Sequence, residues 1–448
     1  MIAMTLARIA EVTGGQVHGD PEVTVHAPAS LDSRDVPAGG LFVALAGDRA
    51  DGHDFARAAL DAGAAAVLSS RPVDGPGVVV DDVTIALGRL GRHAAERSGA
   101  AIVALTGSHG KTSVKDLLAH LLGAHGPTVA TLGNLNNELG VPLTLLRVSE
   151  ETRYLVVEMG ARGIGHIASL CEIAPPDVAM VLNVGSAHVG EFGSVENIAR
   201  AKGEIVESLR PGGTAVLNAD DERVAAMAER VAPGAGIARF GRRADGPVDV
   251  RIEDVTLDEN GEPDVTLRHV GRRWTTHVPL PGAHHGPNLA AAQTVCAALG
   301  LALDTDLDGF VAASPHRMAR HVRADGAVVI DDSYNASPDA VVAALETLAA
   351  VAGRRRIAVL GEMLELGDAT ASEHERVGRA AASLGIDRLI AVDAGPVAAG
   401  FGPGAESVPD VESAVAALRD DLGAGDVVLV KASRGARLER VASALRDA

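Results

Sequence analysis

The chain has 448 residues, of which 47% are hydrophobic, and a formal net charge of −19. One ordinary hydrophobic core does not grow to this length, so we expect roughly two to four domains, with three as the central expectation. The negative net charge argues against general binding to nucleic acid or to an anionic membrane, because such binding requires clustered Lys and Arg residues that neutralise the phosphate charges. A phosphate-bearing substrate must then be met by a local pocket.

Cysteine usage and hydropathy exclude several further classes of protein. The only cysteines, Cys171 and Cys296, lie far apart and form no CxxC pair. This indicates neither a disulfide framework nor a cysteine metal site. The N-terminal residues form no long apolar run, and no later segment approaches ~18 uninterrupted apolar residues. We expect a soluble cytoplasmic protein without membrane insertion.

Short strands and alanine-rich helices alternate along the first hundred residues. The pattern predicts strands at 40–46 and 65–69 and helices at 56–63 and 89–99. From residue 101 onward, apolar runs alternate with helical segments, which is typical of a largely parallel sheet. The predicted strands of this region are 101–105, 128–131, 154–159 and 178–184, and its predicted helices are 114–122 and 194–209.

The second half of the chain begins with an antiparallel excursion and returns to strand-helix alternation. Polar and apolar residues alternate over 249–279, and Pro281-Gly282 marks a turn into a long helix that contains Asn288. The last predicted strands are 327–330, 357–360, 389–392 and 427–430. A breaker at 312–315 sets the last domain edge, so we expect domains at 1–100, 101–313 and 314–448.

A glycine loop between a strand and a helix predicts a phosphate site. The loop reads Gly-x-x-Gly-Lys-Thr, shorter than the eight-residue P-loop because Leu105 stands where that pattern needs glycine. A strand, a glycine turn and a helix start present backbone N–H groups to a phosphate. We expect Lys111 to hold the outer phosphates and the Thr112 hydroxyl to ligate Mg²⁺. A chance match without phosphate binding is the alternative. The residues expected to bind nucleotide here are Gly107, Ser108, His109, Gly110, Lys111, Thr112 and Ser113.

Two further side chains follow neighbouring strands. Glu158 ends one predicted strand and His188 follows another. The carboxyl ends of parallel strands lie together in a doubly wound sheet, so both side chains should converge beside the phosphate loop, where they could bind Mg²⁺. The alternatives are a helix-capping Glu and a histidine that is satisfied by ordinary hydrogen bonds.

Lys202 occupies an unusual place on its predicted helix. It lies four residues after Ile198 and three before Ile205, on the apolar stripe. By this pattern alone the favoured interpretation is a lysine whose methylenes cover the core while its amine reaches water. The loop at 131–142 collects amide side chains, which can donate to phosphate oxygens or simply form turns.

Together these segments resemble a known family, the Mur ligases of bacterial cell-wall synthesis. The motifs TGSHGKTS, GNLNNELGVP, VVEMGA, NVGSAHVGEFGS and ARAKGEI match in order, and residues 32–55 resemble the family's uridine-diphosphate-binding domain. LPGAHHGPNLAAA resembles its adenine-contacting segment. The resemblance implies an α/β fold in the three-domain Mur ligase architecture, with a central P-loop ATPase-like, mostly parallel sheet and a Rossmann-like C-terminal domain.

The C-terminal third indicates which branch of the family the chain resembles. DSYNASP, GEMLELG and VKASRG are similar to the branch that joins D-alanyl-D-alanine to a UDP-N-acetylmuramoyl tripeptide, and the DYAHTP-like and DNPR motifs of an amino-acid-adding branch do not occur. His109, His166, Glu362 and Ala432 depart from the residues common in the family. The alternatives are another amino-acid-adding Mur ligase, a folylpolyglutamate synthase, or a non-catalytic nucleotide-binding relative.

The resemblance also implies residue roles, with ATP and two Mg²⁺ ions as cofactors, and we expect a monomer. Lys111, Glu158, His188 and Lys202 would be catalytic. Thr112 would hold one Mg²⁺, and Glu158, His188 and a carbamylated Lys202 would hold the other. The remaining implied contacts are Asn288, Arg317 and Asp332 with ATP, Ser33, Arg34, Asn134, Asn137 and Arg162 with the UDP substrate, and Lys431, Ser433 and Arg434 with the dipeptide.

Overall fold

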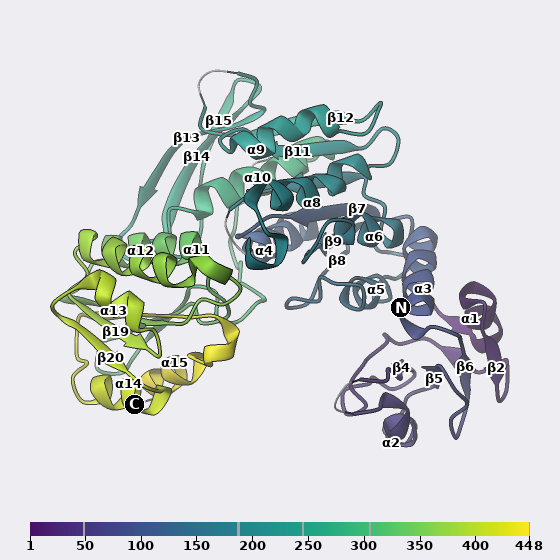
Figure 1. Ribbon diagram of the computed structural model, residues 1–448. Coiled ribbons are helices and arrows are strands. Elements are labelled where there is room, and N and C mark those ends of the chain that lie inside the picture. The colour runs from purple at the N-terminus through teal and green to yellow at the C-terminus, as the bar shows by residue number, and fades with distance from the viewer. Residues whose placement is uncertain (48–49, 186–188, 244–245, 304–305, 448) are drawn as a thin grey trace.

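The protein consists of three units, each built around its own sheet, and the computed structural model describes residues 1–47, 50–185, 189–243, 246–303 and 306–447. The N-terminal unit and the C-terminal unit lie on opposite sides of the central unit and stand apart from each other (Figure 1). In the described part of the chain, no helix has the length and apolar character needed to cross a membrane.

The N-terminal unit is a small four-stranded sheet in the order β2-β6-β5-β4, with a separate two-stranded ladder of β1 and β3. Its strands are β1 (Met4–Thr5), β2 (Gln16–His18), β3 (Thr24–Val25), β4 (Leu41–Val43), β5 (Ala66–Ser69) and β6 (Gly77–Val79), and its helices are α1 (Leu6–Thr13), η1 (Gly52–Phe55), α2 (Ala56–Asp61) and α3 (Val83–Ser98). The Asp82 side chain caps the start of α3, and Gly99 ends it in the left-handed conformation. Helix α3 leads directly into the central unit.

The central unit is a nine-stranded sheet in the order β15-β14-β13-β12-β11-β10-β7-β9-β8. Its strands are β7 (Ala101–Thr106), β8 (Thr128–Ala130), β9 (Tyr154–Glu158), β10 (Val178–Val181), β11 (Thr214–Asn218), β12 (Gly236–Gly241), β13 (Val250–Leu257), β14 (Pro263–His269) and β15 (Arg272–His277). In the sheet order, the strands from β8 to β13 run parallel, and the β13–β14 and β14–β15 pairs are antiparallel. The strands β7, β9 and β10 are runs of buried aliphatic residues because helices cover both faces.

The helices of the central unit pack on the two faces of its sheet. They are α4 (Lys111–Gly123), α5 (Gly140–Leu145), α6 (His166–Ile173), α7 (Val189–Phe192), α8 (Val195–Glu207), α9 (Glu222–Ala226), η2 (Met227–Arg230) and α10 (His285–Ala298). Helices α4 and α10 share one apolar core, and α5, α6 and α8 share the other. That second core continues through α3 into the N-terminal unit, so no polar gap separates the two units there.

The C-terminal unit is a six-stranded sheet in the order β16-β17-β21-β18-β19-β20, parallel except for β16. Its strands are β16 (Ala319–Val322), β17 (Val328–Asp331), β18 (Arg355–Gly361), β19 (Arg388–Val392), β20 (Ala405–Val408) and β21 (Asp426–Lys431). Its helices are α11 (Pro338–Ala350), η3 (Gly367–Ala369), α12 (Thr370–Ser383), α13 (Gly395–Phe401), α14 (Val411–Arg419), η4 (Arg434–Ala436) and α15 (Glu439–Arg446). Separate apolar cores lie on the two faces of the sheet.

The predicted fold class is confirmed, and the element bounds differ in places. The strand predicted at 178–184 stops at Val181, because the next residues bond to the phosphate loop and to Asp221 instead of continuing the ladder. The helix predicted at 89–99 starts earlier, at Val83. The antiparallel excursion predicted at 249–279 is confirmed as β13, β14 and β15.

Candidate active site

A cleft of about 1170 Å³ opens between the central and C-terminal units. The central unit contributes the phosphate loop, the amide loop and the start of α6 to its walls. The C-terminal unit contributes the residues that follow β17, β18 and β21. The cleft therefore lies at the carboxyl edges of two parallel sheets, where α/β proteins bind their ligands.

The phosphate loop leaves β7 and opens α4, as predicted. Gly110 precedes the helix with φ +79°, a conformation that favours glycine, and a Cβ there would lie 3.0 Å from the Asn288 side-chain oxygen. No described residue accepts a hydrogen bond from the backbone N–H groups of residues 110–113. The Lys111 Nζ donates to the Gly107 carbonyl at 2.7 Å. Free backbone N–H groups at the start of a helix, beside a lysine cation, can bind an anion such as phosphate.

Asn183 fixes the first half of this loop. Its Oδ1 accepts from the N–H groups of Ser108 at 2.9 Å and His109 at 3.0 Å, and its Nδ2 donates to the His109 carbonyl at 3.1 Å. The Ser108 hydroxyl in turn accepts from the N–H of Gly185 at 2.8 Å. The residues after β10 therefore hold the loop in shape from one side.

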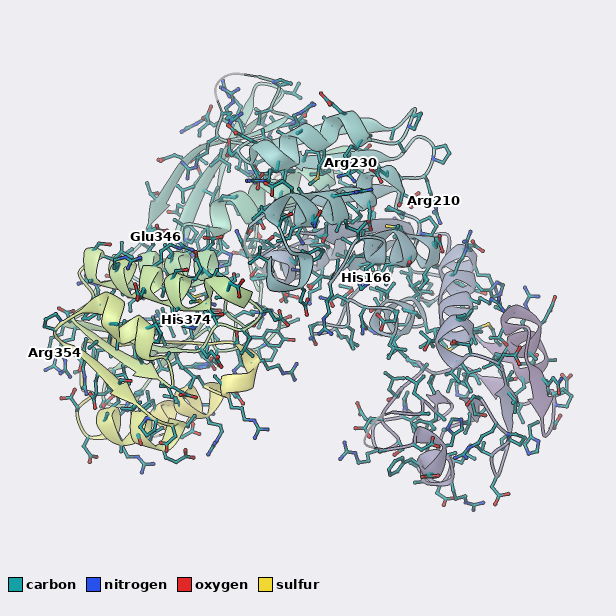
Figure 2. The ribbon with its side chains drawn as sticks, viewed as in Figure 1. His166, Arg210, Arg230, Glu346, Arg354 and His374 are labelled. Carbon is teal, nitrogen blue, oxygen red and sulfur yellow. The ribbon has the colours of Figure 1, made fainter. Side chains whose placement is uncertain are left out.

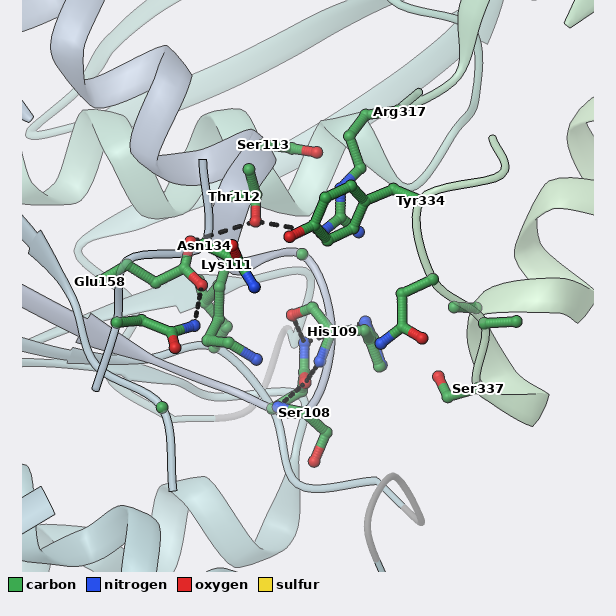
Figure 3. Close-up of a pocket in the computed structure, with 18 of the residues that line it drawn as sticks. Ser108, His109, Lys111, Thr112, Ser113, Asn134, Glu158, Arg317, Tyr334 and Ser337 are labelled. Atoms are coloured by element: carbon green, nitrogen blue, oxygen red, sulfur yellow. Dashed lines mark hydrogen bonds between the residues drawn. The ribbon is translucent and has the colours of Figure 1, made fainter. Parts of the chain in front are cut away.

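Glu158 lies directly beside the phosphate loop at the end of β9. The Thr112 hydroxyl donates to its Oε2 at 3.1 Å, and the Asn136 Nδ2 donates to its Oε1 at 2.7 Å (Figure 3). The Glu158 side chain is buried, and its backbone N–H donates to the Thr131 hydroxyl at 3.0 Å. One carboxylate oxygen is thus bonded to the start of α4 and the other to the amide loop.

Lys202 does not extend into bulk water, contrary to the interpretation that its pattern favoured. Its side chain is buried at 5% exposure and ends in the wall of the cleft. Burial, together with the charge of Lys111, places its pKa well below the ordinary lysine value. No described residue forms a hydrogen bond or ion pair with its amine. His188 lies outside the described residues.

Helix α8 also supports the substrate side of the cleft. The carboxylate of Glu204 accepts from the N–H groups of Gly165 at 2.6 Å and Ala168 at 3.0 Å, which caps the start of α6. His166 begins that helix, is exposed and lines the cleft, on the side of the central unit turned toward the other two units (Figure 2). Arg162 lines the same wall.

The C-terminal unit brings a second polar set to the cleft. The Lys431 Nζ forms an ion pair with Asp332 at 2.6 Å, and both side chains are buried. The Ser433 hydroxyl accepts from the N–H of Leu364 at 3.0 Å. Lys431 and Ser433 are therefore already bonded within their own unit.

Two arginines meet at Tyr334. Arg317 stacks on the ring at 4.2 Å and Arg434 lies 5.5 Å from its centroid. Arg317 also donates to the Thr112 hydroxyl at 3.4 Å, across the cleft (Figure 3). This contact joins the C-terminal side of the cleft to the phosphate loop.

The other predicted residues divide into those inside the cleft and those outside it. Asn134, Asn137, Asn288 and Asp332 line it. Ser33 and Arg34 do not line it: they lie in the N-terminal unit. The Arg34 side chain is 87% exposed and pairs with Asp32, whose carboxyl pKa it lowers to about 2.

Sequence reasoning missed four residues that shape the site. Asn136 orients Glu158, Asn183 holds the loop, Glu204 caps α6, and Tyr334 stacks with two arginines. Each lies inside a segment that the sequence indicates as functional: the amide loop, the stretch after β10, the helix of Lys202, and DSYNASP. The sequence does not show which side chain of such a segment turns toward the cleft.

A glycine loop that opens a helix at the carboxyl edge of a parallel sheet, faced by a second α/β unit, defines a multidomain nucleotide-binding enzyme. The sequence matches the Mur ligase middle domain over residues 105–296, the Mur ligase glutamate ligase domain over 316–434, and the Mur ligase family catalytic domain over 29–93. The chain belongs to the Mur ligase family.

Individual relatives are similar over their whole length. The UDP-N-acetylmuramoyl-tripeptide–D-alanyl-D-alanine ligase of Mycobacterium tuberculosis is 42% identical, with 99% of this chain and 98% of that protein covered. The ligase of the same name from Escherichia coli is 37% identical, with 100% and 99% covered. The solved structure of MurF from Acinetobacter baumannii superposes with a TM-score of 0.87 at 32% identity, covering 100% and 99%. MurF from Thermotoga maritima in complex with ADP gives 0.81 at 32% identity, covering 94% and 98%.

Proposed function

We propose that this chain joins D-alanyl-D-alanine to a UDP-N-acetylmuramoyl tripeptide at the expense of ATP, in peptidoglycan synthesis. The observation that carries the proposal is the cleft itself: an open helix start, Lys111, Glu158 and Lys202 face the polar residues of a second unit. The ligases that the whole chain resembles carry the same name in M. tuberculosis and E. coli. Cytoplasmic location and a monomeric state belong to this proposal.

The reaction fits what the residues can supply. A carboxylate is a poor electrophile, so the terminal carboxylate of the tripeptide first attacks the γ-phosphorus of ATP, and ADP leaves. The dipeptide amine then attacks the carbonyl carbon of the acyl phosphate, and inorganic phosphate leaves with one oxygen of the former carboxylate. Lys111 and the open N–H groups of residues 110–113 would stabilise the negative charge that develops on the transferring phosphate.

The residues at the start of α4 fit a Mg²⁺ site. Thr112 would offer its hydroxyl to one Mg²⁺, and the Glu158 carboxylate lies 3.1 Å from that hydroxyl, within reach of a second ion; both are hard oxygen ligands of the kind that Mg²⁺ prefers. Among the described residues there is no group of three or more His, Cys, Asp or Glu that could hold a metal alone. This agrees with an ion bound by one or two carboxylates and completed by substrate phosphates. When bound, Mg²⁺ would neutralise phosphate charge.

We propose a second Mg²⁺ held by Glu158, His188 and a carbamylated Lys202. A lysine whose pKa is lowered by burial has more of its amine neutral, and a neutral amine can add CO₂ and release a proton. The carbamate would replace a cation beside Lys111 with an anion. The anion would attract the Lys111 cation and would add an oxygen ligand.

The substrates would be divided among three domains at 1–100, 101–313 and 314–448. Asn288, Arg317 and Asp332 would contact ATP. Ser33 and Arg34 would meet the uridine nucleotide, while Asn134, Asn137 and Arg162 would meet its phosphates or peptide. Because Ser33 and Arg34 lie outside the cleft, the N-terminal unit must move, or the extended substrate must span the distance, for one molecule to reach both.

The dipeptide would lie near Lys431, Ser433 and Arg434. Replacing Arg434 with alanine should raise the KM for D-alanyl-D-alanine by about 10- to 150-fold, because one charge-assisted contact is worth roughly 1.5–3 kcal/mol. The KM for ATP should change by less than about twofold. Steady-state phosphate release, with each substrate varied in turn, measures both constants. Equal changes in both would place Arg434 outside the dipeptide site.

The function itself is tested by supplying alternative amines. With ATP and UDP-N-acetylmuramoyl tripeptide present, mass spectrometry should find a new product when D-alanyl-D-alanine is added. No product should form with a single amino acid, glutamate included. A product that forms only with a single amino acid would instead support another amino-acid-adding Mur ligase. ATP binding without any product would support a non-catalytic relative.

A further inference from the structure

A buried polar cluster joins the phosphate-loop helix to the segment that leads into the C-terminal unit. The Lys115 Nζ lies 2.8 Å from Asp116 Oδ1 and donates to the Ser314 hydroxyl at 3.1 Å. The Ser314 N–H donates to Asp116 Oδ2 at 3.2 Å. The three residues are 1%, 5% and 6% exposed, so water does not compete for these bonds. We call Lys115, Asp116 and Ser314 the junction cluster.

The buried ion pair lies within α4, and the hydroxyl and N–H of Ser314 bond the segment before the C-terminal unit to it. The free energy needed to remove two charges from water offsets much of the free energy of their attraction. Apolar side chains of similar size would stabilise the contact at least as well. The two charged side chains provide directional hydrogen bonds. Ser314 is bonded through both its hydroxyl and its N–H, so its position along α4 is fixed.

Lysine usage adds a second observation. Of the 40 lysines and arginines in the chain, only four are lysines, and arginine serves everywhere else. Lys111, Lys202 and Lys431 line the cleft, and Lys115 is the fourth. A compact ammonium with three donors, in place of a planar guanidinium, thus occurs only around the cleft and at the junction.

The residues after Ser314 form a tight and strained turn. His316 has φ +60° and Met318 has φ +52°, and neither is glycine. The His316 ring lies 2.7 Å from Asp331 Oδ2, and the Met318 N–H donates to Asp332 Oδ1 at 3.2 Å. A residue other than glycine keeps this left-handed backbone conformation only where the surrounding contacts hold it in place.

Arg317 lies between these two strained residues and points back to α4. Its Nη2 donates to Thr112, one turn before Lys115 on the same helix, and its Nε is buried without an acceptor among the described residues. The junction therefore touches α4 twice: at the junction cluster and at the Arg317 guanidinium.

We propose that Lys115, Asp116 and Ser314 are positioning residues for ligation, because they fix the junction on α4 and so set Arg317 against Thr112 and the nucleotide phosphates. The proposal rests on the proposed function. The junction cluster acts only through Arg317. Once Arg317 is removed, removing a residue of the cluster should therefore lower ligation no further.

A double-mutant cycle tests this dependence. Ser314→Ala, Arg317→Ala and the double variant are compared with the wild type in the full chain, by ligation kinetics and by calorimetric titration with Mg²⁺-ATP. We expect Ser314→Ala to lower kcat/KM for ATP by about tenfold, Arg317→Ala by at least as much, and the double variant to be no worse than Arg317→Ala within about twofold. The ATP affinities should show the same non-additivity.

The matched control is Thr294→Val in α10. It removes one buried hydroxyl that donates to the Ala290 carbonyl at 2.7 Å and forms no bond with the junction cluster. It should lower the thermal midpoint as Ser314→Ala does, while leaving kcat/KM within about twofold. Wild-type kinetics in Ser314→Ala, or losses that multiply in the double variant, would overturn the proposal. If the wild type forms no product, the proposed function is refuted. The ATP affinities of the three variants would then still test whether the junction cluster acts through Arg317.

Discussion

Replacing Lys111 with alanine should reduce ligation by at least about 1000-fold, because the cation nearest the transferring phosphate is lost. Lys111 opens α4, and its amine already turns over the loop to the Gly107 carbonyl. The fold should persist, since the side chain reaches into the cleft and no apolar core depends on it. Phosphate release at saturating substrates measures the loss, and circular dichroism checks the fold.

Lys111→Arg and Arg379→Ala serve as the comparison variants. The first keeps the charge but replaces a point charge with a planar fork, so it should lose most of the activity as well. The second removes an exposed cation of α12 that pairs with Glu375, and it should leave turnover unchanged. Near-normal turnover in Lys111→Ala would remove the phosphate-loop assignment.

Replacing Lys202 with alanine should lower turnover by about 100-fold or more while Mg²⁺-ATP affinity changes by less than about threefold. The reason is the proposed carbamate: the variant loses a metal ligand next to Glu158 but none of the backbone groups that hold the nucleotide. Added acetate or formate should restore part of the activity by supplying the missing carboxylate. Turnover with and without the acid, alongside calorimetric titration, measures both effects.

The modification itself can be observed. A crystal of the complex with Mg²⁺ and nucleotide should show three additional atoms at the Lys202 Nζ, and ¹³C-bicarbonate should give a carbamate signal that is absent in Lys202→Ala. An unmodified amine in that crystal together with an active alanine variant would return Lys202 to a purely structural buried lysine.

Local sequence signals predicted the elements that carry the site. The phosphate loop, β7, β9 and α8 were predicted because apolar runs, glycines and helical periodicity are local properties. Strands β11, β12 and β20 were not predicted. Strands β12 and β20 are half-buried, as in Gly236–Gly241, and β11 has only three consecutive apolar residues, so none of them gives a long apolar run.

Contacts between distant segments could not be predicted in the same way. Asn183 accepts from loop residues 74 and 75 positions away, and Lys115 donates to Ser314 across 199 positions. Nothing in the local pattern distinguishes these side chains from turn formers or solvated charges. The pattern of Lys202 favoured an exposed amine for a related reason: the stripe showed which face was apolar but not that a cleft wall covers it.

An isotope measurement can establish whether the reaction passes through an acyl phosphate. The UDP-N-acetylmuramoyl tripeptide is labelled with ¹⁸O in its terminal carboxylate and turned over with ATP and D-alanyl-D-alanine. If the carboxylate attacks the γ-phosphorus, each inorganic phosphate released should carry one ¹⁸O, and the ADP none. Unlabelled phosphate, or label in AMP with release of pyrophosphate, would contradict the mechanism assigned to this cleft.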